Sequence, residues 1–109
     1  MNCQVTFRPE AENDVEAAVA WYSSERAALA LAFVDNLDQL LLRLRETPLQ
    51  FPEVAVGVRR ALMARFPYGV FFQVVAEQVV ILGVLHLHRN PSTWRSRRGG
   101  GPAGVSSSA

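Results

Sequence analysis

The apolar residues of this 109-residue chain change their spacing near its middle, and this change limits the folds open to it. In the first half they recur every three or four positions, whereas beyond Gly57 they gather in short β-type runs. The helical spacing is clearest at four positions, Phe33, Leu37, Leu40 and Leu44. Helical segments followed by consecutive strands predict an α+β fold, in which helices cover one sheet.

Six main elements are expected, in the order β-α-α-β-β-β. Residues 5–7 alternate with polar neighbours before Pro9, as a short first strand does. A helix follows from Ala11, an interruption is expected at residues 23–24, and a second helix ends at residues 47–48. Because the link between them is short, the two helices should pack as an antiparallel hairpin.

Three β-type runs are expected in the second half, after an irregular connection over residues 49–56. The runs cover residues 58–66, 70–75 and 79–87, and residues 76–78 form a tight turn between the last two. Such short connections predict an antiparallel meander, one face of which the helical hairpin covers. One more helical turn is expected around Trp94.

The length and composition predict a single small domain. We expect it to span residues 1–98, followed by a disordered glycine- and serine-rich tail over residues 99–109. The single cysteine, Cys3, cannot form an intramolecular disulfide, and the chain has neither a signal-peptide core nor an apolar run of membrane-spanning length. These features predict a soluble cytoplasmic protein with no membrane partner.

Charge is divided unevenly between the two halves of the chain. Residues 1–54 hold nine acids and four arginines, whereas residues 55–109 hold seven arginines and Glu77 alone. This division predicts an anionic partner for the second half, either nucleic acid or an acidic protein segment, although a solvated basic rim would have the same sequence. The residues expected in such a basic patch are Arg65, Arg89, Arg95, Arg97 and Arg98, with Trp94 among them.

Several short motifs follow one another in a fixed order over about residues 4–97. They are Ala11-x-x-Asp14-Val15-x-x-Ala18 before Trp21-Tyr22, Phe33 with the leucines of the second helix, Pro48 with Phe51-Pro52, Gly57-Val58-Arg59-Arg60, Phe66-Pro67-Tyr68 with Phe71-Phe72, and His86-x-x-Arg89-Asn90-Pro91 with Trp94. Together they resemble the RelE/ParE superfamily of toxins from type II toxin–antitoxin modules, most closely its plasmid-stabilisation-type branch.

This resemblance implies a growth-inhibiting toxin that an antitoxin neutralises by wrapping it with an acidic or amphipathic segment, in an oligomeric complex. RelE-like relatives cleave mRNA on the ribosome without a metal ion, whereas ParE-like relatives poison DNA gyrase and are not known to hydrolyse anything. Neither activity implies a cofactor.

Cleavage of RNA by its own 2′-OH needs a base, an acid and cations around the phosphate. The candidate catalytic residues for these roles are His86, Arg59, Arg65 and Arg89. Two positions depart from the nuclease pattern: Gly69 stands where nuclease-competent relatives often have arginine, and Phe72 where they often have tyrosine. We therefore favour gyrase inhibition, with ribosome-dependent mRNA cleavage or a non-toxic antitoxin-binding module as alternatives.

Alternation along the strands gives further expectations. His86 and His88 should face the same side of one strand, but a metal site would need a third ligand that the sequence does not provide. Arg60 should pair with an acid of the helical hairpin, and the aromatic residues 21–22 should pack between helix and sheet.

Overall fold

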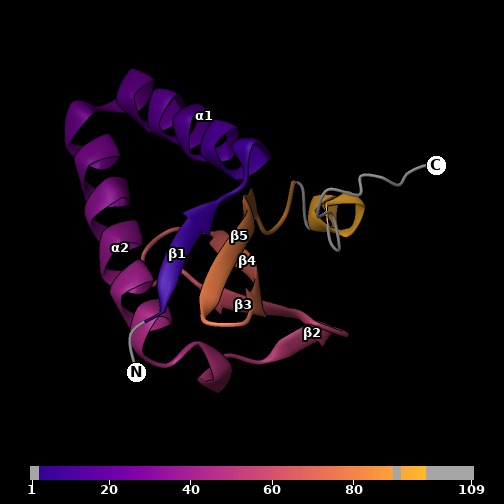
Figure 1. Ribbon diagram of the computed structural model, residues 1–109. Helices are drawn as coiled ribbons and strands as arrows, with labels where there is room; N and C mark the ends of the chain where they lie inside the picture. Colours follow the sequence, from indigo (N-terminus) through magenta and orange to yellow (C-terminus); the bar gives the residue numbers. More distant parts are fainter. Residues whose placement is uncertain (1–2, 90–91, 98–109) are drawn as a thin grey trace.

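A five-stranded sheet with two helices against one of its faces forms the body of the protein (Figure 1). The computed structural model describes residues 3–89 and 92–97. In chain order the elements are β1 (Gln4–Phe7), α1 (Pro9–Glu25), α2 (Ala27–Glu46), the 3-10 turn η1 (Pro48–Gln50), β2 (Glu53–Ala55), β3 (Val58–Leu62), β4 (Tyr68–Val75), β5 (Gln78–His86) and the 3-10 turn η2 (Thr93–Ser96). This arrangement confirms the predicted α+β class and the helical turn around Trp94. The tail predicted for residues 99–109 lies outside the described residues, within which no helix is both long and apolar enough to cross a membrane.

The sheet is mixed, because its first strand runs parallel to its last. The strand order is β1-β5-β4-β3-β2, and all neighbouring pairs except β1 with β5 are antiparallel. The meander of β3, β4 and β5 was expected, but a wholly antiparallel sheet was not obtained. A parallel neighbour requires a long crossover, and the chain between β1 and β5 supplies one. The short strand β2 replaces part of the expected irregular connection, and its pairing with β3 shifts register between Glu53 and Ala55.

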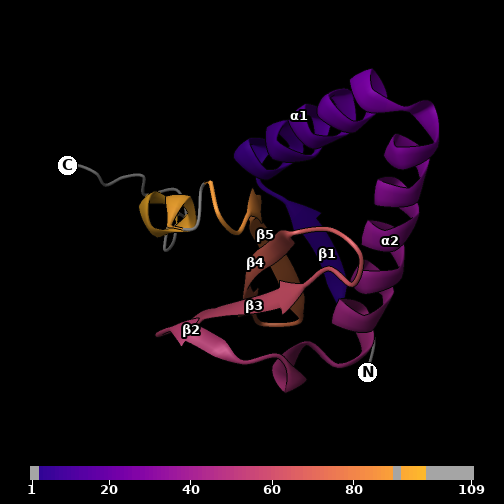
Figure 2. The ribbon, with the colours of Figure 1, turned by 180° about the vertical axis from the view of Figure 1, so that it is seen from behind.

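The two helices are separated at Arg26, whereas the sequence predicted an interruption at residues 23–24. The backbone of Arg26 is extended, with φ −161° and ψ 136°, whereas Ser24 stays inside α1 and donates its hydroxyl to the carbonyl of Trp21 at 2.7 Å. From Arg26 the helices diverge: α1 crosses one end of the sheet and α2 runs alongside β1 (Figures 1 and 2). The expected hairpin is therefore splayed.

Four aromatic rings fill the angle near the point where the helices meet. Their centroids lie 5.0 to 6.2 Å apart in stacked and edge-to-face pairs. The four residues are Tyr22, Phe33, Phe66 and Tyr68. Such pairs add to the free energy gained from burial of the rings and fix how the helices sit on β4.

Each face of the sheet has its own apolar cluster. The larger cluster lies between the helices and the sheet, and Phe33, Phe72 and Ile81 are fully buried in it. The smaller cluster, on the opposite face, consists of Val58, Phe71, Leu82, Leu85 and Trp94. The indole of Trp94 stacks on Phe71 with centroids 5.6 Å apart, so η2 covers the face that the helices leave open.

An ion pair occupies the edge of β5 beyond the end of β1. A bulge in the pairing of β4 with β5 places Phe71 opposite Gly83 and Phe72 opposite Ile81, so that Leu82 has no partner in the register. Asp14 Oδ2 accepts the N–H of Val84 at 3.1 Å and a guanidinium N–H of Arg97 at 2.6 Å. Arg97 also donates to the carbonyl of Leu82 at 3.0 Å, so the pair supplies hydrogen bonds that a neighbouring strand would otherwise make.

Candidate functional site

The end of β5 and the adjacent face of α1 enclose a hollow of about 230 Å³, which we call the His86 hollow. Small residues of α1 leave room for aromatic and titratable side chains from β4, β5 and the turn that follows. Its lining residues are Asp14, Ala17, Ala18, Trp21, Tyr68, Val84, Leu85, His86 and Arg89. Two of the four candidate catalytic residues, His86 and Arg89, therefore share one site.

The backbone of the turn after β5 fixes the imidazole of His86. Its Nδ1 accepts the N–H of His88 at 3.1 Å and the N–H of Arg89 at 3.2 Å. Loss of hydration on burial, followed by the charges of Arg89 and His88, lowers the pKa of His86 from its ordinary value of 6.5. A neutral imidazole with Nδ1 as acceptor carries its proton on Nε2, so the remaining ring nitrogen of His86 is a donor.

His88 does not continue the strand, contrary to expectation, because β5 ends at His86 and residues 87–89 form a turn. The two imidazoles nevertheless lie near each other, with ring centroids 5.8 Å apart. Their relation therefore comes from the turn and not from strand alternation.

Tyr68 packs its ring edge-on against His86, with centroids 5.2 Å apart. Burial raises the pKa of Tyr68; Tyr22 also raises it, Arg89 opposes the rise, and Asp14 adds slightly to it. At neutral pH the phenol keeps its proton. Neither His86 nor Tyr68 is therefore poised to accept a proton from a ribose hydroxyl. The carboxylate of Asp14, which also lines the hollow, is engaged by Arg97 and the N–H of Val84.

Arg89 holds its guanidinium 5.1 Å from the ring centroid of Trp21, a cation–π contact between the turn after β5 and α1. Trp21 is 49% exposed, so the prediction that it packs between helix and sheet is wrong. The helix places successive residues on different faces, which puts Tyr22 into the aromatic angle and Trp21 at the rim of the hollow. The exposed tryptophan and arginine form a flat, cationic surface there.

Arg59 lies away from the His86 hollow. It donates to the carbonyls of Phe51 at 2.6 Å and Leu49 at 3.2 Å, and lies 3.8 Å from the carboxylate of Glu53. In the sheet Arg59 lies opposite Phe72, which is four residues from Tyr68 along β4. At the rise of a strand, this places Arg59 roughly 13 Å from the Tyr68–His86 pair. Arg59 thus holds η1 and β2 against β3.

Arg65 lies in the exposed loop between β3 and β4, and it does not line the hollow. Its backbone N–H donates to Asn36 Oδ1 of α2 at 3.4 Å. The structure therefore brings together His86 and Arg89, but places Arg59 and Arg65 elsewhere.

Arg60 and Gly69 both belong to the face of the sheet opposite the helices. A Cβ on Gly69 would lie 3.4 Å from Cγ of Arg60 and 3.0 Å from a methyl of Leu87. The prediction that Arg60 pairs with an acid of the helical hairpin is therefore wrong, because side chains alternate along β3 and Arg60 faces away from the helices. An arginine at position 69 would likewise start on the face opposite the Tyr68–His86 pair.

The expected basic patch is dispersed. Arg97 is committed to Asp14, with only 14% of its side chain exposed, and Arg95 lies 4.7 Å from the ring centroid of Trp94. Arg89 and Arg65 lie on the turn after β5 and on the β3–β4 loop, and Arg98 is outside the described residues. Of the four arginines of this patch that the structure describes, Arg89 lines the His86 hollow and Arg97 approaches it through its ion pair with Asp14.

Asp14 is the residue of the hollow that charge reasoning missed. An acid in the N-terminal part of α1 suits the helix dipole, which gave no reason to place it in a site. The signal available in the sequence was its place in the motif Ala11-x-x-Asp14-Val15-x-x-Ala18, since Ala11 and Ala18 are both buried and Asp14 lies on the same helical face.

Comparison with known proteins agrees with this architecture. A family model described as the ParE toxin of the type II toxin-antitoxin system parDE matches residues 5–91. A solved structure of the chromosomal ParDE TA system from P. aeruginosa aligns over 77% of this chain and 95% of its own, with a TM-score of 0.69 and 22% identity. That likeness concerns the fold. No curated protein sequence matches the chain.

The family match, together with the fold of two helices against a mixed sheet, thus places the chain among the toxins of the RelE/ParE superfamily. The chain belongs to the ParE toxin family of type II toxin–antitoxin systems, since the match spans most of its length. The predicted toxin function is confirmed, and membership of this family implies an antitoxin as partner.

Proposed function

We propose that this toxin inhibits growth through DNA gyrase and does not cleave RNA. The observation that carries the proposal is the state of His86. Its Nδ1 already accepts two backbone N–H groups, and the pKa of the ring is lowered by burial first and by Arg89 and His88 next. A general base for attack by the 2′-OH would have to accept a proton, and this imidazole has no free acceptor nitrogen.

The arrangement of arginines supports the same proposal. Cleavage of a phosphodiester needs cations around the developing charge, but Arg59 is held by the carbonyls of Phe51 and Leu49. Gly69 supplies no cation and faces the other side of the sheet. Arg89 is left as the one candidate cation beside His86, and its guanidinium lies on Trp21.

The Trp21–Arg89 pair would then contact the target directly. An exposed indole with a guanidinium on its face combines an apolar surface with a fixed positive charge, and both residue types are enriched at the centres of protein interfaces. A protein target such as gyrase suits this surface better than a single phosphate does.

The test measures incorporation of labelled thymidine and labelled methionine in the minutes after the toxin is induced alone, and supercoiling by purified gyrase. We expect thymidine incorporation to fall first and supercoiling to be inhibited. Arg89→Ala should abolish both effects. Arg43→Ala is the matched control, because Arg43 also lies 5.1 Å from an aromatic ring, that of Phe51, and is exposed on α2.

Other outcomes would favour the alternatives. A prompt fall in methionine incorporation with intact DNA synthesis would support ribosome-dependent mRNA cleavage and overturn the gyrase proposal. Accumulation of folded protein with neither synthesis affected would indicate a module that binds its antitoxin without being toxic.

A further inference from the structure

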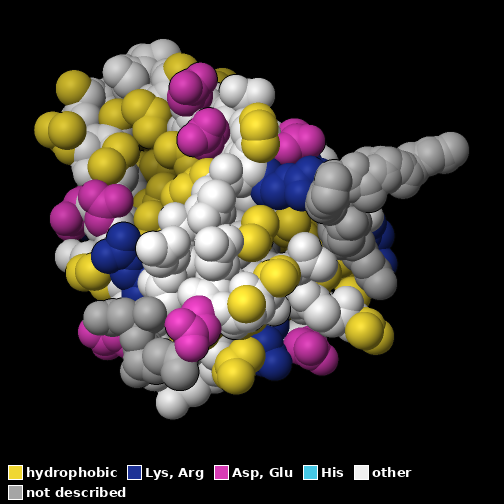
Figure 3. Space-filling view, in the orientation of Figure 1, with side chains coloured by type: hydrophobic (Ala, Val, Ile, Leu, Met, Phe, Trp, Pro, Cys, Tyr) yellow, Lys and Arg dark blue, Asp and Glu magenta, His cyan; other side chains and the backbone are white. Residues whose placement is uncertain are grey.

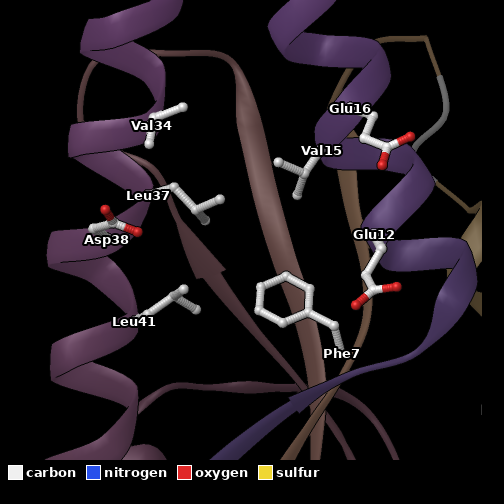
Figure 4. Close-up of a pocket in the computed structure, with 8 residues that line it drawn as sticks. All are labelled: Phe7, Glu12, Val15, Glu16, Val34, Leu37, Asp38 and Leu41. Atoms are coloured by element: carbon white, nitrogen blue, oxygen red, sulfur yellow. The ribbon is translucent and has the colours of Figure 1, made fainter.

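Helix α1 separates two concave surfaces of different charge. On one side it lines a hollow of about 460 Å³ between the helices, on whose rim Glu12 and Glu16 stand (Figure 4). The space-filling view shows acidic side chains on both sides of that apolar hollow (Figure 3). On its other side α1 lines the His86 hollow, where Trp21 meets the cation of Arg89. A target that recognises a positive charge has to approach this second side, so the way in which Arg89 is held matters.

The place of Arg89 depends on the short turn that follows β5. The turn lies outside any helix or strand, so its backbone N–H groups need other acceptors. The N–H of Leu87 donates to the carbonyl of Pro67 at 2.9 Å. The N–H groups of His88 and Arg89 both donate to Nδ1 of His86, at 3.1 Å and 3.2 Å. One side-chain atom therefore binds the two backbone donors that lead to the guanidinium of Arg89.

The ring of His86 is itself held by the sheet and by the aromatic residues. His86 lies opposite Tyr68 in the pairing of β4 with β5, and their rings pack edge-on with centroids 5.2 Å apart. Tyr68 is buried and packs edge-on against Phe33 in the same way. Burial, followed by the charges of Arg89 and His88, lowers the pKa of His86, so at neutral pH the ring is uncharged and Nδ1 can accept.

Leu87 fixes the beginning of the turn on the other face of the sheet. A Cβ on Gly69 would lie 3.0 Å from a methyl of Leu87, which shows how closely that side chain lies over β4. Leu87 also packs against the smaller apolar cluster. The beginning of the turn is therefore fastened independently of His86. Loss of the Nδ1 acceptor would release the end that carries Arg89 and leave the strand in place.

We propose that His86 is a positioning residue for the contact between toxin and target: its Nδ1 caps the turn after β5 and holds the guanidinium of Arg89 on Trp21, in the arrangement that the target binds. The inference rests on the proposed function of the Trp21–Arg89 pair. It assigns His86 neither a contact with the target nor the transfer of a proton. An arginine already held in its bound arrangement loses less conformational freedom on binding, which strengthens the complex.

Two substitutions separate the acceptor from the rest of the ring. The amide oxygen of asparagine is attached to Cγ, as Nδ1 is in histidine, so His86→Asn keeps an acceptor where the two N–H groups need it. The amide of glutamine lies one bond farther from the backbone, so His86→Gln removes that acceptor. The matched control is His88→Gln, which makes the same chemical change at an exposed position of the same turn and keeps its backbone N–H.

Three measurements on the purified toxin compare these variants. In His86→Gln the amides of residues 88 and 89 should exchange their hydrogens about tenfold faster, as observed by NMR. Acrylamide should quench tryptophan fluorescence more strongly as Arg89 leaves Trp21, because Trp94 is only 3% exposed and contributes little. The toxin concentration that halves supercoiling by gyrase should rise about tenfold. His86→Asn and His88→Gln should stay within about twofold of the unaltered toxin in all three.

Two results would overturn the proposal. Unchanged exchange and quenching in His86→Gln would mean that the turn does not depend on Nδ1. Loss of activity in His86→Asn, with its two amides still protected, would mean that His86 acts directly on the target or on a substrate. Exchange and quenching do not involve gyrase, and growth inhibition after induction of the toxin alone is scored beside supercoiling. Failure of the gyrase proposal is therefore distinguishable from failure of this one.

Discussion

Asp14 links segments that lie 83 positions apart in the chain through its contact with Arg97. The two side chains are only 17% and 14% exposed, and each also bonds to the free edge of β5 through Val84 and Leu82. An ion pair largely withdrawn from water is costly to break on one side, because the remaining charge keeps its desolvation penalty and loses its partner.

Asp14→Ala should therefore lower the free energy of unfolding by about 3 kcal/mol, as measured by urea denaturation. The control is Glu10→Ala, which removes the exposed partner of Arg8 at 3.9 Å, where the glutamate side chain is 48% exposed. A surface pair of this kind contributes about 0 to 1 kcal/mol. Equal effects of the two substitutions would mean that the Asp14–Arg97 pair is not structural.

His86 should make the stability of the toxin depend on pH in the acidic range. Burial first, and then Arg89 and His88, lower the pKa of His86 below its ordinary value of 6.5. The unfolded chain therefore binds a proton at a higher pH than the folded one, and the free energy of unfolding must fall as pH drops through 6.5 toward the folded pKa.

Urea denaturation between pH 8 and pH 5 checks this expectation, with His86→Gln as the variant. Its stability profile should be flatter than that of the unaltered protein just below about pH 6.5. In His88→Gln most of the slope should remain, because His88 is exposed and its charge is the smallest of the three causes that lower the pKa of His86. A profile for His86→Gln that overlays the original would show that another group titrates.

At the scale of elements, the spacing of apolar residues predicted the buried face of a helix, because that face depends on residues close together in the sequence. The 4-3-4 spacing of Phe33, Leu37, Leu40 and Leu44 marks one face of α2, and all four side chains are buried. The parallel pairing of β1 with β5 could not be predicted in this way, since it depends on a contact between residues more than seventy positions apart. The bulge at Leu82 is equally invisible, because β5 reads as one continuous apolar run.

Gly83 is the residue of β5 that the ion pair requires. A Cβ there would lie 2.9 Å from Nη1 of Arg97 and 3.2 Å from Oδ2 of Asp14. Gly83→Ala should therefore cost about 1 to 3 kcal/mol of stability through overpacking, measured by thermal or urea unfolding.

A double-mutant cycle separates this clash from the ordinary effect of alanine in a strand. In an Arg97→Ala background the methyl group has room, so the added cost of Gly83→Ala should fall markedly. An undiminished cost would place the strain elsewhere in β5.

At the scale of the whole molecule, the site was predictable only where its residues are neighbours in sequence. His86 and Arg89 were found together because the turn after β5 joins them. Arg59 was assigned to the same chemistry from residue type alone, but the fold uses its guanidinium to hold η1 and β2. The division of charge predicted a basic surface, yet ion pairing and stacking within the fold disperse it.

Both faces of the sheet are covered, so the last turn of the described chain should be part of the folding unit. Without η2, the apolar side chains of Val58, Phe71 and Leu82 would lose the cover of Trp94, and the Asp14–Arg97 pair would be lost as well. Loss of a buried tryptophan side chain alone costs about 3 to 5 kcal/mol, which is a large part of the roughly 5 to 15 kcal/mol that stabilises a typical domain.

We therefore propose that residues 1–98 form the folding unit, and two truncations test it by circular dichroism and binding of the dye ANS. A chain ending at residue 98 should unfold at the same temperature as the full chain, because it keeps η2 and Arg97. A chain ending at residue 89 should lose most of its cooperative transition and bind ANS through the uncovered face, as apolar surface without specific packing does. If the shorter chain melts as sharply as the longer one, the second cluster is dispensable and the helices alone stabilise the sheet.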